Sequence, residues 1–133
     1  MSFERTELAV RVYYEDTDFS GRVYHASYLR FLERGRTEWL RGQGLSHQEL
    51  ASSCGVVFAV RSMQIDFLGP ARIDDLLRVE TLVSDLRGAS MEFRQKILLG
   101  EKPLVAATVL VAAIKDGRSA RLPASLRQAP ARP

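Results

Sequence analysis

One long helical segment stands out in a sequence that otherwise has the spacing of strands. Between about residues 25 and 41, apolar side chains recur at helical intervals, at Tyr28, Phe31, Leu32, Gly35 and Trp39. At ~1.5 Å per residue this helix is on the order of 25 Å long, enough to cross a small sheet. Gly35 weakens a helix by about 1 kcal/mol relative to Ala. We therefore expect it to mark a close approach between the helix and the element beneath it.

The rest of the chain alternates apolar and polar residues with a period of two. This pattern predicts strands at residues 7–14, 56–67, 76–85, 90–99 and 104–114. The alternation slips near Arg61-Ser62, which predicts a β-bulge. Turn residues at Arg87-Gly88 separate two of these strands, and Asp116-Gly117 ends the last one. Residues 104–114 are almost wholly apolar, as in a central strand that is covered on both faces.

These elements predict a single α+β domain over residues 1–133, with one helix laid on a five-stranded antiparallel sheet. Because sequential strands joined by short turns usually pair, we expect neighbours in sequence to be neighbours in the sheet. The apolar last strand favours a second subunit on the open face, and hence a homo-oligomer. A short helix starts at Ser46, where Ser46 and Glu49 form a capping box. The proline-containing tail from about residue 123 is expected to fray in part, at its end.

Composition excludes several classes of function. With 133 residues and a net charge of +3, the chain resembles an ordinary soluble domain, and it has no nucleic-acid motif, apolar membrane span or signal-peptide pattern. Its only cysteine, Cys54, excludes an internal disulfide, fits a cytoplasmic location, and is expected to be a buried small side chain. Two His and one Cys do not suffice for a zinc site without carboxylates. We expect neither a metal nor an organic cofactor.

Three acids precede the long helix: Glu15, Asp16 and Asp18. One interpretation is a solvated turn that caps the helix. A second is a site for Mg²⁺ or Ca²⁺, but no spaced series of further oxygen ligands follows. A third is catalysis, because a helix N-terminus presents unpaired N–H groups that stabilise negative charge on a carbonyl oxygen. A carboxylate beside that end can attack the carbon or activate a water, and Gly21 lets the backbone approach a ligand.

The residues Asp18-x-x-Gly21-x-Val23, followed by Tyr28 and Glu33, resemble the signature of the 4-hydroxybenzoyl-CoA thioesterase family of hotdog-fold proteins. The longer run VRVYYEDTDFSGRVYHASYLRFLERGRTEWLR is similar to one branch, the Tol-Pal-associated (YbgC-type) acyl-CoA thioesterases. PARIDDLLRVET resembles the same branch. The resemblance covers residues from about 9 to 123. It departs from the family pattern at Arg22 and at Phe19-Ser20, which flank the expected acyl site.

The resemblance implies a hotdog fold, in which the sheet wraps around the long helix, and dimers or tetramers with active sites at the dimer interface. It implies hydrolysis of an acyl-CoA, or of an acyl group on acyl carrier protein, with Asp18 as nucleophile or general base. His25 matches a helix-start residue of this branch and is our candidate oxyanion donor through its backbone N–H. The substrate-binding residues that we expect are Tyr14, Gly21, Val23, Tyr24, Tyr28, Arg61, Arg87 and Ser90. Arg61, Arg87 and Ser90 are candidates for the CoA phosphates.

Other polar residues have structural interpretations. We expect Asp16 to stabilise the loop, Glu33 to pair with Arg36 at i+3, and His47 to be exposed on the short helix. Two rival functions stay open: a hotdog dehydratase or hydratase that uses His25 with Asp18, and an acyl-thioester-binding subunit without catalysis. Only a thioesterase releases a thiol from a saturated acyl-CoA.

Overall fold

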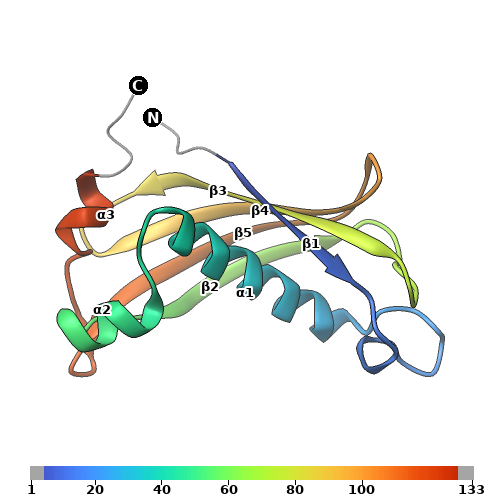
Figure 1. Ribbon diagram of the computed structural model, residues 1–133, viewed down its shortest axis with the longest axis horizontal. Coiled ribbons are helices and arrows are strands. Elements are labelled where there is room, and N and C mark those ends of the chain that lie inside the picture. Colours follow the sequence, from blue (N-terminus) through green and yellow to red (C-terminus); the bar gives the residue numbers. More distant parts are fainter. Residues whose placement is uncertain (1–4, 129–133) are drawn as a thin grey trace.

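The fold consists of one antiparallel sheet with a long helix on one face (Figure 1). A computed structural model describes residues 5–128. In chain order its elements are β1 (Thr6–Arg11), the 3-10 turn η1 (Tyr14–Asp16), α1 (His25–Gly42), α2 (His47–Ser53), β2 (Val57–Phe67), β3 (Leu76–Leu86), β4 (Ser90–Leu99), β5 (Lys102–Lys115), β6 (Arg118–Ser119) and α3 (Ala124–Gln128).

The strand order is β1-β3-β4-β5-β2, and the short β6 pairs with β5. We predicted that neighbours in sequence would pair, and for β2 this is wrong, because β2 pairs with β5 and not with β3. The connection at residues 68–75 is too long for a tight hairpin. It crosses the end of the sheet instead: the Leu68 N–H donates to Leu104 O at the β5 side, and the Val12 N–H donates to Asp75 O at the β1 side.

Local signals within the sheet are confirmed. The register of β2 against β5 shifts between Val60 and Ser62, at the predicted bulge. The Arg87 N–H donates to Ser90 O across the turn between β3 and β4. Asp116 and Gly117 have φ values of 52° and 75° in the turn between β5 and β6, a conformation that the Asp-Gly pair favours.

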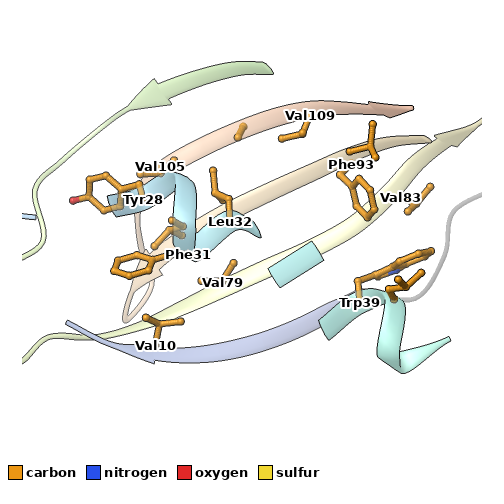
Figure 2. Close-up of a cluster of buried hydrophobic side chains, with 14 of the residues drawn as sticks. Val10, Tyr28, Phe31, Leu32, Trp39, Val79, Val83, Phe93, Val105 and Val109 are labelled. Carbon is orange, nitrogen blue, oxygen red and sulfur yellow. The ribbon is translucent and has the colours of Figure 1, made fainter. Parts of the chain in front are cut away.

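The core lies between α1 and the sheet, and Figure 2 shows Phe31, Leu32 and Trp39 pointing into it. The whole predicted stripe of α1 is buried. Helix α1 packs mainly on β1 and β3. A Cβ added to Gly35 would lie 2.7 Å from Thr81 Oγ1 and 2.8 Å from Val79 Cγ1. The absence of a side chain at Gly35 therefore lets the helix touch β3, as predicted.

A buried polar network also joins α1 to the sheet. The Gln95 amide nitrogen donates to Leu32 O and to Thr81 Oγ1, both at 2.9 Å. Its oxygen accepts a bond from Arg36 at 3.1 Å. Burial lowers the pKa of the Arg36 guanidinium, and the negative charge of Glu33 partly opposes this. The network satisfies polar groups that would otherwise be buried without partners.

One boundary differs from the prediction. The first strand ends at Arg11, and the chain turns at η1, so that Tyr14 is 82% exposed and does not continue the buried face of the strand. The first part of the tail forms α3, a helix that we did not predict: Leu122 and Leu126 are buried, and the Leu122 N–H donates to Gly88 O. The prolines at 130 and 133 lie outside the described residues.

Candidate active site

Residues 17–23 form a small hairpin between β1 and α1, at the end of the molecule where the chain enters the helix (Figure 1). Thr17 bridges Val23, and the Asp18 N–H donates to Arg22 O at 2.9 Å. The Gly21 N–H donates to Asp18 O at 2.9 Å. Gly21 has a φ of 81°, which favours glycine. The turn thus fixes the backbone of Asp18 and leaves its side chain exposed.

The two oxygens of the Asp18 carboxylate have different surroundings. Oδ1 accepts hydrogen bonds from the Ser20 N–H at 2.8 Å and from the Ser20 hydroxyl at 2.5 Å. These bonds, the hydroxyl's first, hold the pKa of the Asp18 carboxyl below its ordinary value of 3.8. Among residues 5–128, no donor contacts Oδ2. One oxygen is therefore anchored while the other is open to a ligand, and the group is an anion at neutral pH.

Asp16 is the structural member of the acidic stretch, as predicted. Its buried carboxylate accepts bonds from the Tyr13 N–H at 2.8 Å and from Arg30 at 3.2 Å. Its carbonyl oxygen accepts from the Tyr24 N–H at 2.9 Å. Because Arg30 belongs to α1 and Tyr24 is its N-cap residue, Asp16 ties the hairpin to the start of the helix.

The first turn of α1 leaves backbone donors available beside this hairpin. The Ser27 N–H donates to Tyr24 O at 2.8 Å. Within the described part of the chain, the N–H groups of His25 and Ala26 have no acceptor. They are among the N–H groups that any α-helix leaves unpaired at this end. The His25 ring is exposed and lies 4.5 Å from the Tyr24 ring and 6.2 Å from the Phe67 ring, centroid to centroid.

Two of the expected binding residues belong to the packing around the site. Tyr28 is buried, its hydroxyl accepts a bond from the Ala71 N–H at 3.0 Å, and burial raises its pKa. Val23 is buried too, and its N–H donates to Ala71 O at 2.8 Å. Both side chains position the hairpin and the helix start.

The chain does not bring every expected site residue to Asp18. Arg87 and Ser90 lie where β3 turns into β4, roughly 33 Å along β3 from its start at Leu76. Arg61 lies in the bulge of β2, roughly 20 Å along the strand from Phe67. Arg87 is also held by Asp85 at 2.7 Å. Within one chain, these three residues are therefore remote from the hairpin.

Three predictions for other polar residues need comment. Glu33 accepts a bond from the Thr37 hydroxyl at 2.9 Å, and not from Arg36, which turns inward to Gln95. His47 is exposed as expected, but its Nε2 lies 3.2 Å from Thr37 Oγ1. Cys54 was expected to be buried and is exposed, because it follows the last turn of α2.

The sequence reasoning missed two contacts. Ser20 was noted only as a departure from the family pattern, although Asp-x-Ser is a pattern in which an Asp side chain bonds to the backbone two residues on. Phe67 against His25 is a tertiary contact between β2 and α1, for which the local sequence holds no signal.

Between residues 5 and 128, no group of three or more His, Cys, Asp or Glu side chains is placed to hold an ion. In the same range, no helix has the length and apolar character needed to span a bilayer.

Comparison with known sequences finds the family model "Thioesterase superfamily" over residues 20–106, which begins just after Asp18. The "Acyl-CoA thioesterase YbgC" of Haemophilus influenzae is 47% identical over 109 residues, covering 82% of this chain and 80% of the relative.

Solved structures of thioesterases are also similar to this chain. A probable thioesterase from Bartonella henselae has a TM-score of 0.87 and 48% identity, covering 90% of this chain and all of that one. The 4-hydroxybenzoyl-CoA thioesterase of a Pseudomonas strain also has a TM-score of 0.87, over 94% of this chain and 98% of its own. At 22% identity, that second likeness concerns the fold alone.

Proposed function

Because the chain belongs to the thioesterase superfamily, we propose that it hydrolyses the thioester of an acyl-CoA and that the Asp18 carboxylate is the attacking group. The family and the hotdog fold are those that the sequence resembled. The observation that carries the role of Asp18 is its geometry: Oδ1 is anchored by Ser20, Oδ2 is open, and the hairpin is tied to the start of α1.

The thioester carbonyl binds with its oxygen at the first turn of α1. The His25 N–H is the donor that we assign to the developing oxyanion, because it is unpaired and lies at the positive end of the helix dipole. Gly21 and Tyr24 are exposed and flank the place that we assign to the carbonyl oxygen. Tyr28 is buried and supports the first turn of α1 from the core side. The His25 side chain contacts the substrate beside Phe67.

We propose direct attack by Asp18 on the thioester carbon. Hydrogen bonds from Ser20 hold the pKa of the Asp18 carboxyl below its ordinary value, so the group is ionised at neutral pH, as a carboxylate nucleophile must be. In the proposed step, Oδ2 bonds to the carbonyl carbon, the C–S bond breaks, and the CoA thiolate leaves and takes a proton from water. A second water then hydrolyses the mixed anhydride, which releases the carboxylic acid and restores the Asp18 carboxylate.

The phosphates of CoA require cations at the mouth of the site. The backbones of Arg22 and Arg72 form an antiparallel β-bridge beside the hairpin. The side chains of both arginines therefore branch from backbone that lies close to Asp18. Three expected phosphate ligands lie too far from the Asp18 hairpin of their own chain to contact the same CoA: Arg61, Arg87 and Ser90. We therefore propose that they contact CoA bound at the site of a neighbouring subunit.

This assignment rests on a homo-oligomer. No strand within residues 5–128 pairs with the outer edge of β2, and Val57, Val60 and Phe67 on this strand are about half exposed. An unpaired apolar edge is a common place for strand pairing between chains. We propose a dimer joined edge to edge, which can associate again into a tetramer.

Acyl carrier protein is a second possible donor of the acyl group, because it presents the same kind of thioester as CoA. The branch that the sequence resembles leads us to propose a cytoplasmic enzyme associated with the Tol-Pal system, acting without a metal or an organic cofactor.

Replacing Asp18 tests the proposal. Asp18→Asn keeps an oxygen for the Ser20 bonds but removes the nucleophile, so thiol release from a saturated acyl-CoA should fall by about 10⁴-fold or more while the fold and acyl-CoA binding are retained. Glu15→Gln, at an exposed acid of the same stretch, is the matched control and should keep wild-type turnover. Near-wild-type turnover of Asp18→Asn would exclude this mechanism.

Thiol release also separates the rival functions. A dehydratase or hydratase would leave the thioester intact, and a binding subunit would bind acyl-CoA without turnover.

A further inference from the structure

A pocket of about 120 Å³ lies beside the C-terminal half of α1, away from the Asp18 hairpin. Its lining residues are Glu33, Arg36, Thr37, Leu40, His47, Phe58, Val60, Met91, Phe93 and Val111. Met91, Phe93 and Val111 are buried and apolar. Cavities of about 150 Å³ with such linings bind a molecule as large as benzene, so this pocket has room for a few carbon atoms.

The polar residues around the pocket are paired with one another or with the core. The Thr37 hydroxyl donates to Glu33 and lies 3.2 Å from His47 Nε2. Arg36 donates to Gln95 at 3.1 Å. These polar groups already have partners, so an apolar occupant leaves none of these bonds broken.

One face of α1 connects the pocket to the candidate active site. His25, Leu29, Glu33 and Thr37 follow each other at intervals of four residues, which places them on one face of the helix. At one end of this face, His25 contacts Phe67 of β2. At the other end, Thr37 lines the pocket together with Phe58 and Val60 of β2. The face therefore looks toward β2 along its length.

Apart from Glu33, whose carboxylate accepts a bond from the Thr37 hydroxyl, the side chains between these two ends are apolar. Leu29 on α1 is 39% exposed, and Phe67 on β2 is 49% exposed. Met63 and Ile65 of β2 are half-buried against the core. An apolar chain that starts at Asp18 thus meets apolar side chains along this path until it reaches the pocket.

We propose that this pocket holds the far end of the acyl group, so that the preferred substrates are linear acyl thioesters of medium to long chain. The inference rests on the proposed thioester hydrolysis at Asp18. Glu33 to Thr37 lie about 12 to 18 Å from His25 along the helix. An extended chain gains roughly 1.2 Å per bond, so about ten or more carbons are needed to reach the pocket.

The chain-length profile of the wild-type enzyme is the first test. We expect kcat/KM for thiol release to rise only slightly with each carbon among acyl-CoAs too short to reach the pocket, because the side chains along the path are partly exposed. It should then rise about fourfold for each carbon that enters the pocket, as burial of a methylene group gives. A profile that is highest for the shortest chains, or that shows no rise near ten carbons, would overturn the inference.

Filling the pocket is the second test. Thr37→Phe should lower the ratio of kcat/KM for dodecanoyl-CoA to that for butyryl-CoA by tenfold or more. Phe58→Trp fills the pocket from the β2 side and should have the same effect, which keeps the test valid if one variant does not fold. Glu38→Phe, the adjacent residue on α1, pairs with Arg41 outside the pocket and should keep the wild-type ratio.

Binding without turnover separates this inference from the proposed function. Titration of Asp18→Asn with both acyl-CoAs should give tighter binding of dodecanoyl-CoA, and Thr37→Phe in that background should abolish the difference. If the wild-type protein releases no thiol from any acyl-CoA, the proposed function fails. If it does release thiol but both pocket variants keep the wild-type ratio, only the pocket assignment fails.

Discussion

At the scale of single residues, the candidate site depends on how one carboxylate is held. Ser20 gives Asp18 two hydrogen bonds on the same oxygen, which stabilise the anion and orient the second oxygen outward. Asp16, two positions earlier, is buried and bound to Tyr13 and Arg30. Two acids of one short stretch thus differ in role because one faces the core and the other faces solvent.

The Ser20 hydroxyl is testable through pH. Activity that requires the Asp18 anion declines as pH falls through the pKa of that group. Ser20→Ala removes the largest cause of the lowered pKa, so the pKa should rise and the acid limb of kcat/KM should move to higher pH. Steady-state thiol release from neutral pH to below about 4 measures this shift.

Two controls accompany the measurement. Circular dichroism at each pH checks that the protein is folded. Ser46→Ala removes a serine that caps α2 and should leave the acid limb in place. An acid limb that stays unchanged in Ser20→Ala would show that Asp18 does not control the profile.

At the scale of elements, α1 serves both the core and the site. Its buried stripe packs on the sheet, its N-terminus offers the free N–H of His25, and its β2-facing side leads to the pocket. The close approach at Gly35 sets the depth of the helix on β3. The position of Gly35 therefore influences where the N-terminal end of the helix lies.

Paired glycine substitutions in α1 test this contact. Gly35→Ala forces a methyl group against Thr81 and Val79, so we expect the free energy of unfolding to fall by about 1–3 kcal/mol, as overpacking does. A Cβ at Gly42 meets only Thr6 Cγ2 at 3.8 Å, so Gly42→Ala should be neutral or stabilising by up to about 1 kcal/mol. Urea denaturation measures both. Equal effects of the two substitutions would contradict the proposed contact.

At the scale of the whole molecule, the edge strand β2 carries exposed apolar side chains. In the part of the chain that the structure describes, β2 pairs with β5 on one side only, and Arg61, Arg87 and Ser90 lie far from the hairpin of their own chain. Both observations are accounted for if two copies join at β2, because residues remote in one chain can then approach the site of another.

The assembly can be measured directly. We expect light scattering on the purified protein to give the mass of a dimer or a tetramer, and Val57→Lys, which places a charge on an exposed residue of the edge strand β2 outside the pocket, to shift the distribution toward smaller species. The matched substitution Leu76→Lys, at an exposed apolar residue of β3, should leave the assembly unchanged. A wild-type protein that is a stable monomer would remove the basis for sites shared between subunits.

Much of the fold was predictable because its signals are local. The stripe of α1, the bulge near Arg61 and the Asp116-Gly117 turn each depend on the periodicity or conformational preference of a few neighbouring residues. The place of β2 beside β5 was not predictable in this way, since the pairing depends on which strand has a free edge. The short helix α3 was missed because its burial depends on contacts with distant parts of the chain.

The sequence by itself determined one α+β domain, the thioesterase family, and a short acidic stretch before a helix with Asp18 as the residue to test. The tertiary structure decided which acid is buried, which oxygen of Asp18 is open, and which distant side chains lie beside the helix. It also revealed the pocket between α1 and β2. Periodicity and motifs fix what each segment becomes, whereas the surroundings of a side chain depend on segments that only folding brings together.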